Sequence, residues 1–233
     1  NVWHFRQFLK NLSEKGQSAH EKSIRVCKEI LADKKLKASI RLRAMWGLYA
    51  LNKLNPETHL VDPSEHIRTW AIRLMIDDQP IDTLFGPGKN ILPANNPILE
   101  KKFISLAKTE NSALVRLAIA SSLQRLPVSY RGELAKALAS RPEDINDHNL
   151  PMLVWAGVNP LVENDPNGLI QVARSTQWPH LRTWIARTIT ERFTEHPLAF
   201  DTLLELAGDQ SGYANSLLAG MERAVCLLYT SPS

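Results

Sequence analysis

A helical spacing of apolar residues runs through almost the whole chain and constrains its fold more than any other feature. Apolar residues recur every three or four positions, whereas the alternation typical of strands is nearly absent. Breaks containing proline, glycine or asparagine divide this pattern into short segments. The sequence therefore predicts an all-α protein with helices over residues 3–12, 18–32, 38–53, 64–77, 98–109, 112–126, 129–139, 149–157, 167–175, 180–195, 198–207 and 211–224.

A short motif opens four of these helices: an aliphatic residue, an arginine, and an alanine within about one turn. Its arginines are Arg41, Arg68, Arg116 and Arg182. The aliphatic residue and a later leucine or isoleucine share one helix face and pack inward, while the alanine lets a partner helix come close. The arginine is placed where its guanidinium can bridge to a carboxylate or carbonyl of the adjacent repeat.

Helix pairs of this kind cannot bury their apolar faces alone, so they stack on one another. We therefore expect an α-α superhelix, a HEAT/armadillo-like solenoid, as a single segment over residues 1–225. The motif arginines are 27, 48 and 66 residues apart, so the longer intervals must hold insertions or degenerate repeats. The ending CLLYTSPS (226–233) breaks the helical pattern and resembles a translated sequencing adaptor, so we expect a non-native tail there.

Residues 80–97 interrupt the helical pattern with four prolines and two glycines, which exclude a regular helix. The stretch is either a surface excursion between helix pairs or a functional loop. We favour the excursion, held to the body by Leu84, Phe85, Ile91 and Leu92.

Charge and cysteine usage narrow the possible partners. Residues 1–79 carry 14 Lys and Arg against 9 Asp and Glu, whereas residues 80–233 carry 14 against 15. A basic N-terminal third could suit nucleic acid, but its charges are interleaved as on a solvated helix face and lack a regular aromatic stacking platform, so no nucleic-acid partner is expected. Cys27 and Cys226 have no metal or redox spacing, and Cys27 lies in an apolar stripe typical of a buried residue.

The densest polar cluster, residues 143–149, could bind a cation or cap the helix that follows. Its spacing does not match an EF-hand, and Asp147 or Asn149 suits a helix cap with Pro151 in the first turn. We expect a cap here and no metal site in the chain; His196, for example, has no ligand-like neighbour three or four positions away.

Three tryptophans, Trp155, Trp178 and Trp184, follow this cluster, with Arg182 and Arg187 close in sequence. They could form the core, as aromatics at helical spacing usually do, or line a pocket for an anionic or planar ligand. The candidate contact residues are His148, Trp155, Arg182 and Arg187. No catalytic residue is proposed, because the sequence contains no nucleophile elbow, phosphate loop, dinucleotide fingerprint or HExxH.

Four stretches resemble the helical-repeat region of large secreted proteins of planctomycetes and verrucomicrobia, described as membrane-bound dehydrogenase-like or haem-binding proteins. They are HIRTWAIRL (66–74), VRLAIASSLQRLP (115–127), NDHNLPMLVWAGVNPLV (146–162) and LRTWIAR (181–187). In that family the repeats follow a β-propeller and precede a c-type haem domain, and this chain contains neither. The loop at 80–97 departs from the plain connection expected in relatives.

The resemblance implies a non-catalytic scaffold or interaction segment of a larger exported redox protein. It implies a periplasmic or secreted location, no cofactor in this segment, and haem c in a C-terminal part of the parent. The expected partners are proteins or neighbouring domains of the same chain. Two alternatives stay open: a wall of the active site of a sugar or alcohol dehydrogenase, and a free-standing protein-binding adaptor.

Overall fold

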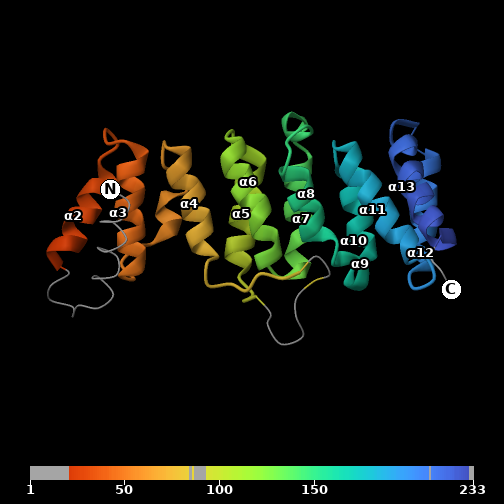
Figure 1. Cartoon of the computed structure of the whole chain (residues 1–233), viewed down its shortest axis with the longest axis horizontal. Coiled ribbons are helices and arrows are strands. Elements are labelled where there is room, and N and C mark those ends of the chain that lie inside the picture. The colour runs from red at the N-terminus through yellow and green to blue at the C-terminus, as the bar shows by residue number, and fades with distance from the viewer. Residues whose placement is uncertain (1–20, 84–85, 87–92, 210, 231–233) are drawn as a thin grey trace. The chain divides into compact units, whose positions relative to one another are not determined.

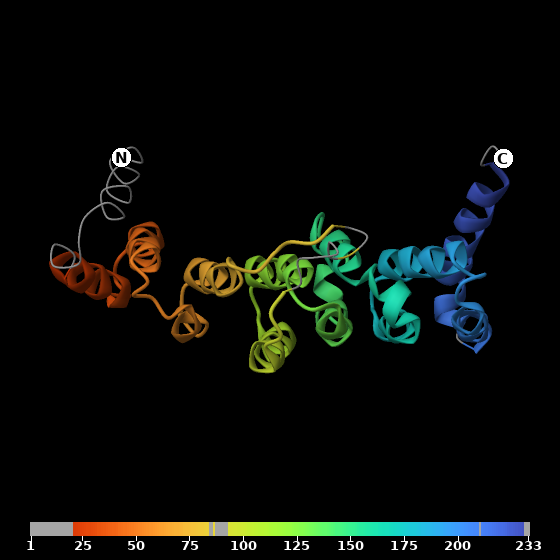
Figure 2. The same cartoon turned by 90° about the horizontal axis from the view of Figure 1, so that it is seen from below.

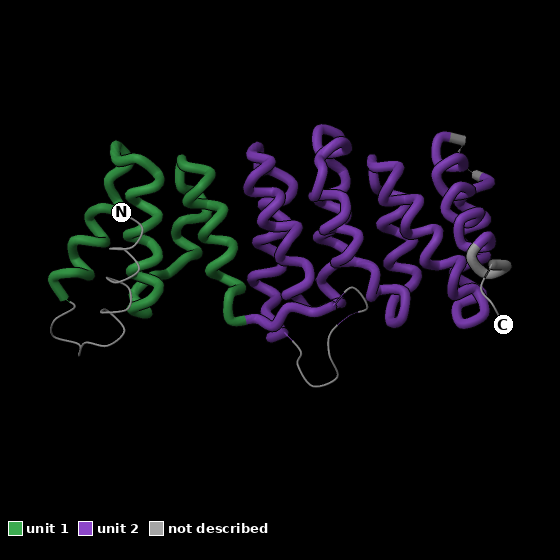
Figure 3. The backbone as a smooth tube through the Cα atoms, viewed as in Figure 1, with its two compact units in different colours: residues 1–78 green, residues 79–233 purple. Residues whose placement is uncertain are grey.

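The computed structural model describes residues 21–83, 86, 93–209 and 211–230, with the backbone alone at residues 209, 211 and 227–230. Over these residues the chain is all-helical and forms no sheet, apart from an isolated bridge between Thr83 and Gly86. The chain divides into two compact units, residues 1–78 and 79–233 (Figure 3). The single continuous segment expected over residues 1–225 therefore stays a prediction.

The first unit packs three helices in chain order. Helix α2 (Glu21–Ala32) packs on α3 (Ala38–Ala50), and α3 packs on α4 (Glu65–Met75), with the 3-10 turn η2 (Pro56–His59) against α4. Met45, Ile67 and Ile72 are fully buried between them. Cys27 is buried too, as predicted, and this burial raises the pKa of its thiol.

The second unit begins with α5 (Pro97–Thr109), α6 (Ala113–Ser122) and α7 (Val128–Ala139). It continues with α8 (Leu150–Val158), the single turn α9 (Leu161–Asn164) and α10 (Pro166–Ser175). Helices α11 (Pro179–Glu191), α12 (Pro197–Asp209) and α13 (Ser211–Thr230) complete it (Figure 1). The 3-10 turns η3 (Leu123–Arg125) and η4 (Pro142–Asp144) lie between the longer helices.

Helices of the second unit form two rows. Helix α7 packs between α5 and α10, and α10 also contacts α12. In the other row α8 packs between α6 and α11, and α11 packs closely along α13 (Figure 2). Because α7 also contacts α8 and α10 contacts α11, the rows bury one shared apolar layer that includes Leu134, Val154 and Ile185.

Local capping chemistry places most helix starts where the sequence predicts them. Proline occupies one of the first two positions of α5, α8, α10 and α11, where its missing N–H costs no helical hydrogen bond. The side chains of Asn96 and Asp165 accept hydrogen bonds from the backbone amides of Leu99 and Gly168, at 3.1 and 2.8 Å.

Several helix ends differ from the expected ones; α6, for example, ends at Ser122 rather than residue 126, and the 3-10 turn η3 follows it. Helix α3 ends at Ala50 rather than residue 53, and Asn52 adopts a left-handed φ of 55° just beyond it. Helix α11 ends at Glu191 rather than residue 195. At the C-terminus, α13 continues through Cys226 to Thr230, so the prediction of a break at residue 226 is wrong for the backbone. The helix expected at 3–12 lies outside the described residues.

The irregular stretch is non-helical at residues 80–83, 86 and 93–96, whereas Pro97 is the first residue of α5, and the stretch is attached to the second unit at its start. Asp82 donates its backbone N–H to the carbonyl of Gln124, at 2.9 Å, and its carboxylate pairs with Arg131. Arg125 donates to the carbonyl of Gln79, at 2.5 Å. The anchors predicted at Leu84, Phe85, Ile91 and Leu92 lie outside the described residues.

Substitution of Gly220 by alanine should destabilise the protein, because the backbone of α11 leaves no room for a Cβ there. A Cβ at this position would stand 2.3 Å from the carbonyl oxygen of Thr183 and 2.8 Å from Cβ of Ala186. Overpacking of this kind costs about 1–3 kcal/mol, which a lower midpoint of urea unfolding would report. As a control, Gly208→Ala in α12 meets nothing within 4 Å and should be neutral or stabilising by up to about 1 kcal/mol. Equal effects of the two variants would contradict the close approach.

Candidate functional site

The arginine of the repeat motif joins three elements in the first unit. Arg41 in α3 is 2 % exposed and donates to the carbonyl of Leu31 at the end of α2, at 3.0 Å. Its two terminal nitrogens donate to the carboxylate of Asp62, at 3.0 and 2.5 Å. Lys34 pairs with the same carboxylate. Burial opposes ionisation of Asp62, but the hydrogen bonds from Arg41, Lys34 and the backbone amide of Ser64 outweigh it and lower its pKa to about 2.

Arg116 repeats this arrangement in the second unit. It donates to the carbonyl of Glu110, just after α5, at 2.9 Å, and to both carboxylate oxygens of Asp144, at 2.5 and 2.6 Å. The hydrogen bond to Asp144 raises the pKa of this guanidinium above its ordinary value. As in the first unit, one buried guanidinium ties the end of the preceding helix to an acid further along the chain.

The other two motif arginines use carbonyl oxygens. Arg68 donates to the carbonyls of Asp62 and Pro63, at 2.8 and 3.3 Å, and so supports the loop that Arg41 also holds. Arg182 donates to the carbonyls of Ala173 and Thr176, at 3.1 and 2.5 Å. The carboxylate position is taken by the hydroxyl of Ser216, at 3.3 Å, and the ring of Tyr213 lies 3.9 Å from the guanidinium carbon.

The polar cluster at 143–149 is largely occupied by structural contacts. Asp147 accepts hydrogen bonds from the backbone amides of Asn149 and Leu150, at 2.9 and 2.7 Å, and so caps α8 as predicted. Asp144 is the buried partner of Arg116, and the more exposed Glu143 pairs with Arg141 at 2.7 Å.

The candidate site is a pocket of about 290 Å³ between α8 and α11. The indoles of Trp155 and Trp184 line it, with ring centroids 5.9 Å apart and planes inclined at 57°. The exposed ring of His180 stacks near Trp184, at 6.2 Å. The complete lining consists of apolar, polar and charged side chains of these two helices and their ends: Met152, Trp155, Asn159, Trp184, Arg187, Thr188, Glu191 and Arg192.

Some polar groups in the pocket form hydrogen bonds or ion pairs, whereas one buried donor does not. Thr188 donates to the side-chain oxygen of Asn159, at 3.2 Å, and Arg187 pairs with Glu191 at 2.7 Å. The indole nitrogen of Trp155 is buried and donates no hydrogen bond within the described residues. A buried donor without an acceptor costs about 1–3 kcal/mol, so a ligand that supplies an acceptor here gains binding energy.

The structure brings together two of the four contact residues predicted from sequence. Trp155 and Arg187 line the pocket, together with Trp184, which the sequence also singled out. His148 is exposed just before α8 and does not line the pocket. Arg182 is 3 % exposed and holds carbonyls inside the stack. Trp178 belongs to the core: it is fully buried and donates to the carbonyl of Arg141, at 2.8 Å.

Sequence reasoning missed five of the lining residues: Met152, Asn159, Thr188, Glu191 and Arg192. Met152 and Asn159 follow from helical periodicity once Trp155 and Trp184 are known to face each other, because Met152 precedes Trp155 by three positions and Asn159, just after α8, follows it by four. Whether the two tryptophans face each other depends on how α8 and α11 pack, and local sequence patterns do not predict this packing.

No family model matches the chain, and no curated protein and no solved structure matches it. None of the described helices is both long and apolar enough to cross a membrane. The resemblance to dehydrogenase-like, haem-binding proteins therefore stays an expectation.

Removal of one partner from the buried Arg116–Asp144 pair should strongly destabilise the second unit. Asp144→Ala leaves the charge of Arg116 buried without the carboxylate that pairs with it. Loss of one partner of a buried ion pair lowers the free energy of unfolding by about 3–5 kcal/mol. Urea unfolding followed by circular dichroism measures the loss. Glu133→Ala removes the exposed partner of Lys136 and should cost less than about 1 kcal/mol. A comparable loss of unfolding free energy in both variants would contradict a larger contribution from the buried pair.

Acid should weaken the first unit through Asp62. Because its pKa is about 2 in the folded protein and 3.8 in its ordinary state, ionised Asp62 stabilises the fold above about pH 4. This contribution, about 2 kcal/mol, is lost as the pH falls toward 2. The stability difference between the wild type and Asp62→Asn, measured by urea unfolding, should therefore shrink from pH 6 to pH 2. A difference independent of pH would contradict the lowered pKa.

Proposed function

We propose that the chain is a HEAT-like α-solenoid segment that binds a partner polypeptide, and that the pocket between α8 and α11 holds one of the partner's side chains. The observation that carries this proposal is the pair of indoles, Trp155 and Trp184, around a pocket with a buried, unsatisfied N–H. The two rows of helices support the solenoid part of the proposal, since stacked helix pairs leave one face of each row open along its length.

The pocket's chemistry favours a planar side chain that carries a hydrogen-bond acceptor. Two inclined indoles offer ring faces and edges to a planar group, and aromatic pairs of this type add about 0.5–1.5 kcal/mol beyond burial. The free N–H of Trp155 supplies one directed donor. A volume of about 290 Å³ suits one side chain rather than a large cofactor.

The lining groups are suited to binding. Tryptophan and arginine are the residues that most often dominate protein interfaces, and here they lie together on α11 as Trp184 and Arg187. Arg187 forms an ion pair with Glu191, so its positive charge is already partly neutralised. Its contribution to the pocket is therefore mainly the apolar part of its side chain.

The place of this segment in a larger protein is a separate proposal that rests on the family resemblance alone. On that basis the segment spaces a propeller from a haem c domain in an exported bacterial redox protein, and its partner is a neighbouring domain of the same chain. The alternatives remain an active-site wall of a dehydrogenase and a free-standing adaptor. Full-length protein would separate them: substrate-dependent reduction of an electron acceptor that Trp184→Ala abolishes favours the active-site wall. Arg182→Ala is a poor probe of this question, because Arg182 holds buried carbonyls.

A peptide selection tests the binding function directly. Peptides selected from a random displayed library against the purified chain should include binders with an aromatic or amide side chain, and Trp184→Ala should weaken them at least about tenfold, or about 1.4 kcal/mol. Fluorescence anisotropy of a labelled selected peptide gives the affinity. The same peptide should shift the indole N–H resonance of Trp155 in a nitrogen-15 correlation spectrum.

The matched control is Trp70→Ala in the first unit. Trp70 forms a similar pair with Trp46, with ring centroids 4.7 Å apart, and has Arg73 over its ring. The substitution removes an aromatic of the same kind from a helix outside the pocket. If Trp70→Ala and Trp184→Ala weaken the selected peptides equally, or if neither does, the pocket is not the binding site.

A further inference from the structure

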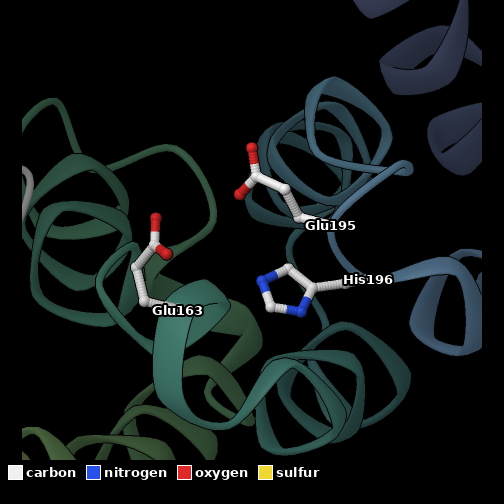
Figure 4. A group of neighbouring side chains, drawn as sticks. All are labelled: Glu163, Glu195 and His196. Atoms are coloured by element: carbon white, nitrogen blue, oxygen red, sulfur yellow. The ribbon is translucent and has the colours of Figure 1, made fainter.

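A second group of side chains lies at the end of the same helices, where three potential metal ligands from two segments converge. Glu163 comes from α9, whereas Glu195 and His196 come from the connection between α11 and α12. One ligand atom from each side chain lies within 4.8 Å of the other two. Figure 4 shows the two carboxylates and a ring nitrogen of His196 directed toward a common space.

The histidine has an unsatisfied atom in this group. Nε2 of His196 is buried and has no hydrogen-bond partner within the described residues. A buried polar atom of this kind normally binds a donor, an acceptor or a metal. Because the neighbouring groups are carboxylates, a cation placed between them would satisfy the imidazole nitrogen and both negative charges together.

The backbone around His196 is fixed before any ion arrives. The amides of Glu195 and His196 both donate to the carbonyl of Arg192, at 3.1 and 3.0 Å. The carbonyl of His196 accepts from the amides of Ala199 and Phe200 in the first turn of α12, at 3.1 Å each. The backbone that carries two adjacent ligands is therefore held in place, whereas the exposed side chains of Glu163 and Glu195 have to adjust.

We infer that Glu163, Glu195 and His196 form a binding site for a divalent first-row metal ion, with Zn²⁺ as the best-suited ion. One imidazole and two carboxylates are a donor set that Zn²⁺ accepts, at about 2.0–2.2 Å per bond, with water completing a tetrahedral site. Ligand atoms of such a site are about 3.4 Å apart, so separations of up to 4.8 Å need a contraction within reach of glutamate rotamers. Mg²⁺ and Ca²⁺ prefer oxygen ligands alone and fit this set less well.

Arg192 opposes the metal in the described state. Its guanidinium forms an ion pair with Glu163, so a metal ion must take this carboxylate from it. Arg192 also lines the pocket between α8 and α11, and metal binding therefore releases a positive group next to Trp155 and Trp184. This competition gives a test that a chance cluster would not pass: removal of the arginine should strengthen metal binding.

The test is isothermal titration calorimetry of the untagged, chelator-treated full chain with ZnCl₂ and, separately, MgCl₂. We expect one Zn²⁺ per chain and no Mg²⁺ binding under the same conditions. His196→Ala and Glu163→Gln should each weaken Zn²⁺ at least about tenfold, the lower range for loss of groups that only support a metal ligand. Glu163 is exposed, so its variant keeps the fold even if His196→Ala does not. Arg192→Gln should bind Zn²⁺ more tightly than the wild type.

His180→Ala is the matched control, because His180 is an exposed histidine of α11 outside the cluster. Co²⁺ in place of Zn²⁺ should give d–d absorption without thiolate charge transfer, which separates this site from one at Cys27 or Cys226. Absence of stoichiometric Zn²⁺ binding, or binding that Glu163→Gln leaves unchanged, would overturn the inference. Neither result depends on peptide binding in the pocket, so the two proposals fail separately.

Discussion

Burial of arginine inside a helix stack is the constraint on which the rest of this structure depends. A guanidinium is costly to remove from water unless its charge is paired and its nitrogens donate hydrogen bonds. Arg41 and Arg116 meet this condition in the same way, by donating to a carbonyl at the end of the preceding helix and to an aspartate further along the chain. Because both partners must be present at once, each arginine fixes the spacing of three elements and not merely of two.

Departures from this arrangement follow the same rule. Arg182 meets Ser216 and Tyr213 where Arg41 and Arg116 meet an aspartate, and it also donates to two carbonyls. Arg131 in α7 is fully buried and donates to the carbonyls of Leu126 and Gly157, with Asp82 as its acid. The irregular stretch therefore contributes a counter-ion to the core, although burial raises the pKa of Asp82 despite its pairing with Arg131. In each case the buried guanidinium donates to the nearest carbonyl, hydroxyl or carboxylate oxygen.

The pocket and the proposed metal site share α11 and its end, which makes them parts of one region. Trp184 and Arg187 face α8, and the chain after Glu191 turns so that Glu195 and His196 face α9. Arg192 belongs to both groups, since it lines the pocket and pairs with Glu163. An ion that displaces Arg192 from Glu163 would change the charge beside the indoles, so occupancy of the proposed metal site would alter the pocket through a single side chain.

The sequence by itself determined the helices, their proline and asparagine starts, and the role of the motif arginines as donors to carboxylates or carbonyls, because capping and helical periodicity are local. It also selected Trp155 and Arg187, since aromatic and basic residues were already grouped along the chain. It could not separate these from Arg182, which lies in α11 with Arg187 but is buried in the stack, or from His148, which stays exposed. Only the tertiary structure decided that Asp62 and Asp144 are the acids of the motif and that Glu163 meets His196, because these partners are 21 to 33 residues apart and meet only through the packing of non-adjacent elements.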